Sequence, residues 1–352
     1  MKKITKTVQF IKKHFRGFIP IFFLVVTMIS CKKDLNPISQ TKEGLAQPSS
    51  IESECSTLNE VGYDFDGINI VYEIDNDILR FSNWVDFHES VLLLEKKYDI
   101  HNNARDLQIP NGLSDEEMDA LDEEVGFDPF YTYRQLENQF SGFNSKRKII
   151  EETENTWLFN DMTGLDPDDI DFTFDDAENT LFNQNYEVKV GCNIYKMSDD
   201  GLLNLTNPEE TMNIESNTNT NQTEAEGCFT NARKTERVSI SNHEIKLKVA
   251  INKFIFRSSV KAKAVNFRQK SNGKWRRSRT EIAVHIGGII FDKKCNGNLS
   301  IGLRNPTSGF KKRGEIRELY RWGDTNRKTK KHLLAASVEL PNLPMSQVLI
   351  EK

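Results

Sequence analysis

Two His-Glu pairs come nearest to a zinc-protease motif in this 352-residue chain. That motif needs a second histidine four positions after the first, so that both imidazoles lie on one helix face. Leu92 stands four residues after His88, and Leu247 stands four residues after His243. The nucleophile motif Gly-x-Ser-x-Gly of serine hydrolases is also missing from the sequence. The sequence therefore identifies no catalytic residue, no metal ligand and no cofactor site.

Carboxylates are abundant, and one dense group lies in residues 165–176, with the sequence LDPDDIDFTFDD. Calcium favours several oxygen ligands on a bending loop. The spacing and the glycine of an EF-hand are absent, however, so an acidic surface loop is favoured over a calcium site. Glycosidases need two suitably spaced carboxylates, and dozens of candidates single out no pair. A glycan hydrolase is retained as the alternative function, without named catalytic residues.

Basic residues with interleaved aromatic residues form the strongest functional signal. Such patterns are typical of strands that bind anionic polymers. The competing interpretation is an ordinary solvated face, with the tryptophans in the core. The candidate polyanion-binding residues are Lys261, Lys263, Arg268, Lys270, Lys274, Trp275, Arg276, Arg277, Arg279, Lys311, Lys312 and Arg313.

The distribution of charge divides the chain. The net charge is −31 over residues 51–226 and +19 over residues 227–352, although the whole chain carries only −5. Two adjacent segments of such opposite charge indicate two domains. Either the two halves attract and dock, or the basic half faces an anionic partner while the acidic half maintains solubility.

The N-terminus predicts export and lipid anchoring. A basic segment (1–16) is followed by an uncharged apolar segment (17–30) and then by Cys31. This order is typical of a secretory signal that ends in a lipobox, where the cysteine is acylated. The apolar segment is shorter than the ~20 residues that span a bilayer. We therefore expect a lipoprotein of a bacterial envelope, with the outer membrane as the favoured location.

Four further cysteines remain for disulfides in an exported chain: Cys55, Cys192, Cys228 and Cys295. They permit three connectivities. The charge boundary near residue 227 favours Cys55–Cys192 and Cys228–Cys295, and four unpaired thiols are the alternative. No Cys-x-x-Cys spacing supports zinc or thioredoxin-type chemistry.

The acidic half has the pattern of an α+β domain. Strands are expected at 68–74, at 185–197 and at 202–205, and the last two are expected to pair across a turn at 198–201. Ser114 and Glu117 form a capping box that predicts a helix ending at Gly126. The other expected helices cover 83–98 (capped by Ser82), 131–140 and 145–156.

The basic half has the pattern of an all-β domain. Apolar and basic residues alternate along 243–256, which is the period of a strand. Asn272-Gly273 predicts a hairpin between 260–267 and 275–284. Further strands are expected at 287–291, 299–303, 316–322 and 333–340, which together suggest a β-sandwich or a jelly roll.

The acidic half resembles uncharacterised lipoproteins of Bacteroidota over about residues 77–205. The resemblance rests on RFSNWVDFHESVLLLEKKYD (80–99), on the aromatic run 127–143 and on YEVKVGCNIYKMSDDGL (186–202). It implies a location and an architecture but no activity. Many surface-exported members have acidic residues after the lipidated cysteine, whereas this chain has Lys32 and Lys33.

These observations lead to an exported, lipid-anchored and non-enzymatic binding or interaction module. The expected partners are the membrane, through the lipid, and an anionic polysaccharide, lipopolysaccharide or a protein; nucleic acid is less favoured. A structural protein with mutually docked charged domains is the second alternative. The predicted organisation is a signal peptide (1–30), a tether (31–50), an acidic α+β domain (51–205), an Asn/Thr-rich linker (206–226), a basic all-β domain (227–342) and a tail (343–352).

Overall fold

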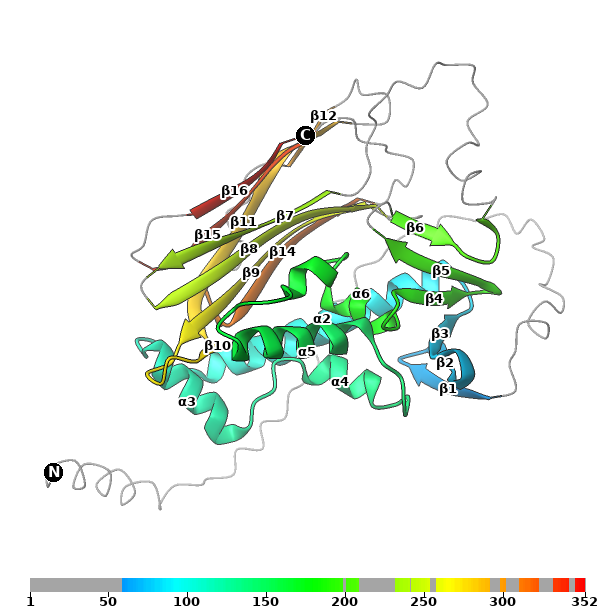
Figure 1. Ribbon diagram of the computed structural model, residues 1–352, viewed down its shortest axis with the longest axis horizontal. Helices are drawn as coiled ribbons and strands as arrows, with labels where there is room; N and C mark the ends of the chain where they lie inside the picture. Colours follow the sequence, from blue (N-terminus) through cyan, green and yellow to red (C-terminus); the bar gives the residue numbers. More distant parts are fainter. Residues whose placement is uncertain are drawn as a thin grey trace, which may run out of the picture. The chain divides into compact units, whose positions relative to one another are not determined.

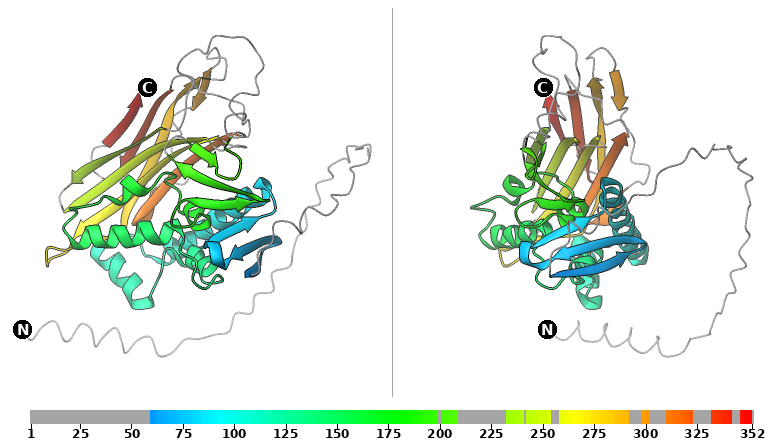
Figure 2. Two further views of the ribbon diagram at one scale, coloured as in Figure 1. Left: turned by 45° about the vertical axis from the view of Figure 1, so that its right-hand side comes forward. Right: turned by 90° about the vertical axis from the view of Figure 1, so that its right-hand side faces the viewer.

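The fold is that of a computed structural model, shown in Figures 1 and 2. The chain divides into two compact units, Met1–Ser49 and Ser50–Lys352. The helices and strands described below all belong to the second unit. The structure describes residues 59–198, 201–208, 232–240, 242–253, 258–291, 298–301, 310–322, 332–341 and 346–351.

Six short strands of the acidic half form one sheet in the order β1-β2-β3-β4-β5-β6. All neighbours pair antiparallel except β3 and β4, which pair in parallel with Phe81 opposite Val190. Parallel neighbours need a long connection, and the helices of the protein supply it. The strands are β1 (Glu60–Phe65), β2 (Ile68–Glu73), β3 (Ile78–Phe81), β4 (Glu187–Val190), β5 (Asn193–Ser198) and β6 (Gly201–Asn204).

The connection between β3 and β4 contains five α-helices. Its aromatic and aliphatic side chains pack against the six-stranded sheet, where Phe81, Phe87 and Phe182 form contacts in the main core. The helices are α2 (Trp84–Gln108), α3 (Asp115–Val125), α4 (Tyr131–Glu137), α5 (Lys146–Phe159) and α6 (Asp176–Leu181), and short 3₁₀ turns lie at η2 (Ile74–Asn76) and η3 (Pro167–Ile170).

Side chains at the helix ends explain where the helices start. The predicted capping box is confirmed, because Ser114 accepts from the Glu117 amide while the Glu117 carboxylate accepts from the Ser114 amide. Gly126 ends this helix with φ 63°, a conformation that glycine adopts at little cost. Helix α2 is instead capped by Asn83 rather than Ser82, and it continues ten residues beyond its predicted end at 98.

The basic half contributes only strands to the described structure, and these form two sheets. One has the order β10-β9-β8-β7, with β14 also paired to β9; the other has the order β12-β11-β15-β16, with β13 also paired to β11. The strands are β7 (Ala232–Ile240), β8 (His243–Lys253), β9 (Ser258–Gln269), β10 (Trp275–Arg277), β11 (Thr280–Phe291), β12 (Asn298–Ile301), β13 (Lys311–Arg313), β14 (Glu315–Trp322), β15 (His332–Glu339) and β16 (Ser346–Glu351).

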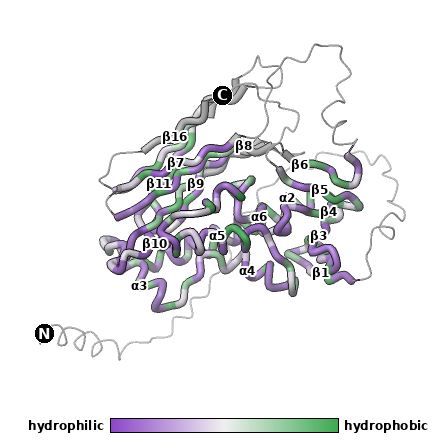
Figure 3. Tube along the Cα trace, in the orientation of Figure 1, coloured by the Kyte–Doolittle hydropathy of each residue, from purple (hydrophilic) through white to green (hydrophobic). Residues whose placement is uncertain are grey.

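The predicted alternation along β8 is confirmed. Ile245, Leu247 and Val249 are fully buried in a hydrophobic cluster with apolar residues of β9, β11, β14 and β15. The intervening side chains point the other way, toward the helices of the acidic half. Hydrophilic and hydrophobic residues therefore both occur along β8 (Figure 3).

Two predicted strands differ in detail from those observed. The strand expected at 185–197 is a hairpin, because the left-handed residue Gly191 (φ 58°) turns the chain between β4 and β5. The strand expected at 275–284 is divided, since β10 pairs with β9 whereas β11 belongs to the other sheet. The hairpin at Asn272-Gly273 is confirmed. Strand β7 was not predicted, and β16 lies in the segment that we assigned to a tail.

Described helices lie between residues 74 and 181, and strands form most of the remaining described structure. The chain is therefore a mixed α/β protein with substantial β content. A small cluster of Trp157, Leu158, Val265 and Phe267 joins helix α5 to strand β9. Helix α5 of the acidic half and strand β9 of the basic half are therefore in apolar contact.

Candidate functional site

Four lysines of β8 and β9 project from the sheet toward the helices. Lys246, Lys248, Lys261 and Lys263 have between 1% and 5% of their surface exposed. Lys248 lies directly opposite Lys263, and Lys263 lies opposite Arg317 of β14. Like charges directly opposite on one sheet face repel, so this row requires nearby carboxylates.

The carboxylates come from residues 166–178, which overlap the acidic stretch 165–176. An exposed surface loop was expected there, but Asp168 and Asp175 are buried because they face this row of lysines. Lys261 Nζ lies 2.7 Å from Asp175 and 3.0 Å from Glu178, and Lys263 Nζ lies 2.8 Å from Asp176. In the same layer Lys246 pairs with Asp166, and Lys248 pairs with Asp168. In the part of the chain that the structure describes, no cluster of histidine, cysteine and carboxylate side chains could hold a metal ion.

Burial and ion pairing shift the pKa values of these buried groups in opposite directions. Desolvation alone would raise the pKa of Asp176, but the Lys263 ammonium outweighs it and holds this pKa well below its usual range. The pKa of Asp168 is lowered in the same way by Lys248 and Lys246. The pKa of Lys263 is raised despite desolvation, because Asp176 and Glu315 both stabilise its charge. We call these pairs between the four lysines of β8 and β9 and the carboxylates of 166–178 the buried ion-pair layer, and each charge in it depends on its partner.

Acid should weaken this layer. Asp166, Asp168 and Asp176 have folded pKa values below the usual value of 3.8. They therefore contribute stability that is present above about pH 4 and is lost as the pH falls through their folded pKa values. Urea unfolding between pH 2 and pH 8 should show a free energy of unfolding that falls mainly below pH 4. A fall centred between pH 6 and pH 7 would contradict this and would implicate histidines.

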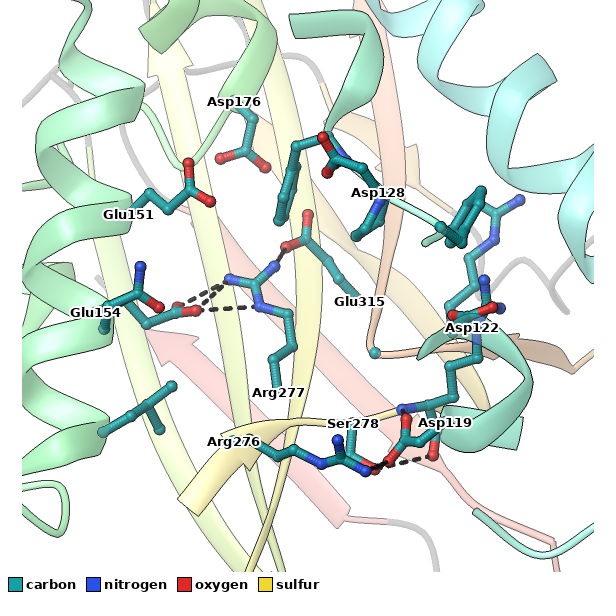
Figure 4. A pocket seen from close by; sticks show the side chains of 18 of the residues that line it. Asp119, Asp122, Asp128, Glu151, Glu154, Asp176, Arg276, Arg277, Ser278 and Glu315 are labelled. Carbon is teal, nitrogen blue, oxygen red and sulfur yellow. Dashed lines mark hydrogen bonds and ion pairs between the residues drawn. The ribbon is translucent and has the colours of Figure 1, made fainter. Parts of the chain in front are cut away.

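The arginines around β10 are paired with helices α3 and α5. Asp119 of α3 is the centre of this group, because it accepts hydrogen bonds from Arg268, Arg276, Ser278 and the backbone amide of Arg279 (Figure 4). Arg279 and Arg276 also pair with Asp122 and Glu123 of the same helix, respectively.

Arg277 of β10 pairs instead with Glu154 of α5 at 2.7 Å and with Glu315 of β14 at 2.5 Å. The basic residues of β13, Lys312 and Arg313, contact the C-terminal end of α2 and the residues that follow it. Lys312 donates to the carbonyl oxygens of Ile109 and Pro110. Arg313 pairs with Asp106 at 2.7 Å.

The structure thus places eight of the twelve candidate polyanion-binding residues, all of them lysines or arginines, in buried or partly buried contacts with acidic or backbone groups. Lys270, Lys274 and Lys311 are more accessible, and Lys270 lies 3.7 Å from Glu123. Trp275 is half-buried against the cluster around Trp157. Binding of an anionic polymer stays a prediction, but for most of these residues it would compete with the pairs described here.

A cavity of about 620 Å³ lies where α3, α5 and β10 meet (Figure 4). Helix α3 contributes Asp119 and Asp122, helix α5 contributes Glu151 and Glu154, and β10 lies below them. The loop before α4 adds Phe127, Asp128 and Phe130. The cavity therefore combines aromatic rings, carboxylates and guanidinium groups from segments that are far apart in the sequence.

Two carboxyl groups of the cavity share one ammonium. Lys263 Nζ lies 2.8 Å from Asp176 and 3.0 Å from Glu315. Burial raises the pKa of Glu315, although Lys263 opposes this effect, whereas the pKa of Asp176 is lowered. The pKa values of these two neighbouring carboxyl groups are thus shifted in opposite directions, as is common for pairs of acid and base catalysts.

The sequence pattern pointed to Arg276 and Arg277 but not to the carboxylates with which they form ion pairs. No sequence pattern singled out Asp119, Glu154 or Glu315. Their partners lie 123 or more residues away for Glu154 and Asp119, so no local spacing could reveal them. The only available signal was the opposite charge of the two halves.

Several predictions fall elsewhere. Cys31, Cys55, Cys228, Cys295 and most of the linker 206–226 lie outside the described residues. Cys192 lies in the turn between β4 and β5, and its disulfide pairing stays a prediction. Within the described residues, no helix is long and apolar enough to cross a membrane.

Comparison with known proteins gives little further information. No family model matches the sequence, and no curated protein matches it. The chain shows a weak similarity to the crystal structure of a DUF4848 family protein from Bacteroides thetaiotaomicron, with 12% identity over 80% of this chain and 100% of that one. The TM-score of 0.15 is too low to support an argument about the fold.

Proposed function

We propose that the protein is a non-enzymatic binding module of a bacterial envelope, and that its ligand site is the cavity between α3, α5 and β10. The observation that supports this site is the convergence of aromatic and hydrogen-bonding side chains on a 620 Å³ space. Ligand sites are usually concave, partly apolar and of this size, with a few polar groups that orient the ligand. Figure 4 shows how the charged groups surround this space.

The proposal includes a lipid anchor at Cys31, which the order of basic, apolar and cysteine residues supports. Mass spectrometry of the mature protein from its native membrane should find an acylated Cys31 at the N-terminus. An unmodified N-terminus at another residue would contradict the anchor without affecting the cavity.

We also propose that the acidic α+β domain and the basic β-sandwich domain dock on one another. The buried pairs from Lys246 to Asp166 and from Lys263 to Asp176 support this arrangement. The contact between Trp157 and Phe267 adds apolar area to it. Under this proposal, most of the basic surface acts within the molecule, and the cavity at the junction is left for a ligand.

The binding site can be tested by calorimetry on the mature chain. The probes are fragments of envelope polymers: neutral oligosaccharides, muropeptides, lipopolysaccharide core and, as a general polyanion, heparin. At least one probe should bind, and Asn155→Trp should abolish this binding because Asn155 is an exposed cavity residue of α5. Thr156→Trp is the matched control, since Thr156 is the exposed neighbour outside the lining. Binding that Asn155→Trp leaves intact, or no binding at all, would contradict the proposed site.

A hydrolase is the second candidate, and the opposite pKa shifts of Asp176 and Glu315 favour it. Release of reducing ends from a bound oligosaccharide, and its loss in Glu315→Gln, would support hydrolysis. Recovery of the intact probe after prolonged incubation would support a binding module.

A further inference from the structure

The charges that line the cavity are already matched. Eight carboxylates and seven basic side chains line it among the described residues. Glu151 pairs with Arg134 and Arg147, and Glu154 pairs with Arg277. Lys274 is the exception among the lining residues described, since it lies 5.0 Å above the Phe159 ring and has no carboxylate partner here.

This balance disfavours an ionic ligand. Outside the exposed Lys274, an anion would have to displace carboxylates such as Asp119 from the arginines, and a cation would have to displace arginines from the carboxylates. Breaking a buried pair leaves an uncompensated charge, which is strongly unfavourable. A neutral ligand can instead bind to the hydrogen-bonding capacity that the pairs leave unused.

Hydroxyl groups suit this lining because each can donate and accept at the same time. A hydroxyl placed between a guanidinium and a carboxylate would satisfy both. The Nε atom of Arg276 is a buried donor without a hydrogen-bond partner among the described residues, and buried donors of this kind are rare. Asn155 adds an exposed amide to the lining.

Aromatic rings supply the apolar part of the lining. Phe159 is 70% exposed at the end of α5, and Trp275 is half-buried on β10. Rings of this kind offer a flat apolar surface against which the C–H face of a sugar can pack. A cation lies 5.0 Å from the ring centre of each lining phenylalanine: Lys274 at Phe159, Arg279 at Phe127 and Arg277 at Phe130. Phe127 and Phe130 are half-buried, so Phe159 is the most accessible of the three rings.

We propose that the ligand of this cavity is an uncharged oligosaccharide. This inference rests on the cavity being a binding site, and it specifies the chemical class of the ligand. It also differs from the expectation of an anionic polymer, which was based on the basic residues before their carboxylate partners were known.

Calorimetry on the mature full chain can test whether the ligand is an uncharged or an anionic oligosaccharide. The neutral probes are cellotetraose, maltotetraose and mannotetraose, and the anionic probes are tetragalacturonate and a heparin tetrasaccharide. At least one neutral probe should bind, with a dissociation constant that changes less than about twofold between 50 and 500 mM NaCl. Polyanion binding would weaken steeply over the same range.

Phe159→Ala should weaken binding of the neutral probe about five- to tenfold, because one stacking surface is lost. Leu107→Ala is the control, since Leu107 is 88% exposed and lies outside the lining. Binding of anionic probes alone, sensitive to Asn155→Trp, would overturn the neutral class and leave the binding site intact. Binding of no probe, or binding unaffected by both cavity variants, would overturn the class and the site together.

Discussion

Replacing Lys263 by methionine is expected to lower the free energy of unfolding by about 3–5 kcal/mol, although methionine fits the space of the lysine stem. Lys263 is 5% exposed, and its ammonium is shared by Asp176 and Glu315. Its removal leaves two neighbouring buried carboxyl groups without their main counter-charge, and breaking one side of a buried pair has this order of cost. Urea unfolding at pH 7 measures the change.

Lys270→Met is the matched control for this prediction. Lys270 directly follows β9, the strand that contains Lys263, but its side chain is 40% exposed and lies 3.7 Å from Glu123. We expect a change within about 0.5 kcal/mol, as for most exposed pairs. The double variant Lys263→Met/Asp176→Asn should recover part of the loss. Equal effects of Lys263→Met and Lys270→Met would contradict the buried network.

Trp157→Ala is expected to lower the free energy of unfolding by about 3–5 kcal/mol, because it removes a buried aromatic contact between α5 and β9. Trp157 is 2% exposed, and its ring centre lies 5.7 Å from that of Phe267 in an edge-to-face arrangement. The Lys246 ammonium also lies 4.1 Å from the Trp157 ring centre. The substitution therefore removes an apolar contact and a cation–π contact together. The same unfolding experiment measures the loss.

Phe159→Ala provides the comparison, since Phe159 lies two residues further along α5 and is 70% exposed. We expect its free energy of unfolding to stay within about 0.5 kcal/mol of the unmodified protein. If the Phe159→Ala protein is stable, its weaker ligand binding is due to the lost contact in the cavity and not to unfolding. If Trp157→Ala were as stable as Phe159→Ala, apolar packing would contribute little to the junction.

Local features of the fold could be predicted because their causes lie within a few residues. The capping box of Ser114 and Glu117, the hairpin at Asn272-Gly273 and the alternation in β8 all belong to this group. The break at Gly191 was missed, because strand patterns on both sides of a tight turn look continuous. Pairing of β3 with β4 depends on contacts across the whole helical connection, and no local pattern predicts it.

The candidate site was only half predictable. The period of two in β8 correctly separated Lys246 and Lys248 from the apolar residues, but it could not show what faced these lysines. Exposure to an anionic partner and burial against Asp166 or Asp168 produce the same alternation. The opposite net charges of the two halves left docking open, and the partner residues required the three-dimensional arrangement.

The position of the carboxylates before the lysines in the chain affects the order of folding during synthesis. Asp168 and Asp176 leave the ribosome well before Lys248 and Lys263, with which they pair. Until β8 and β9 follow, water must solvate these carboxylates, although Ala177 and Leu181 of α6 can already pack in the core of the acidic half. A nascent chain that stops before residue 243 should therefore remain open along this side and be a substrate for chaperones or proteases.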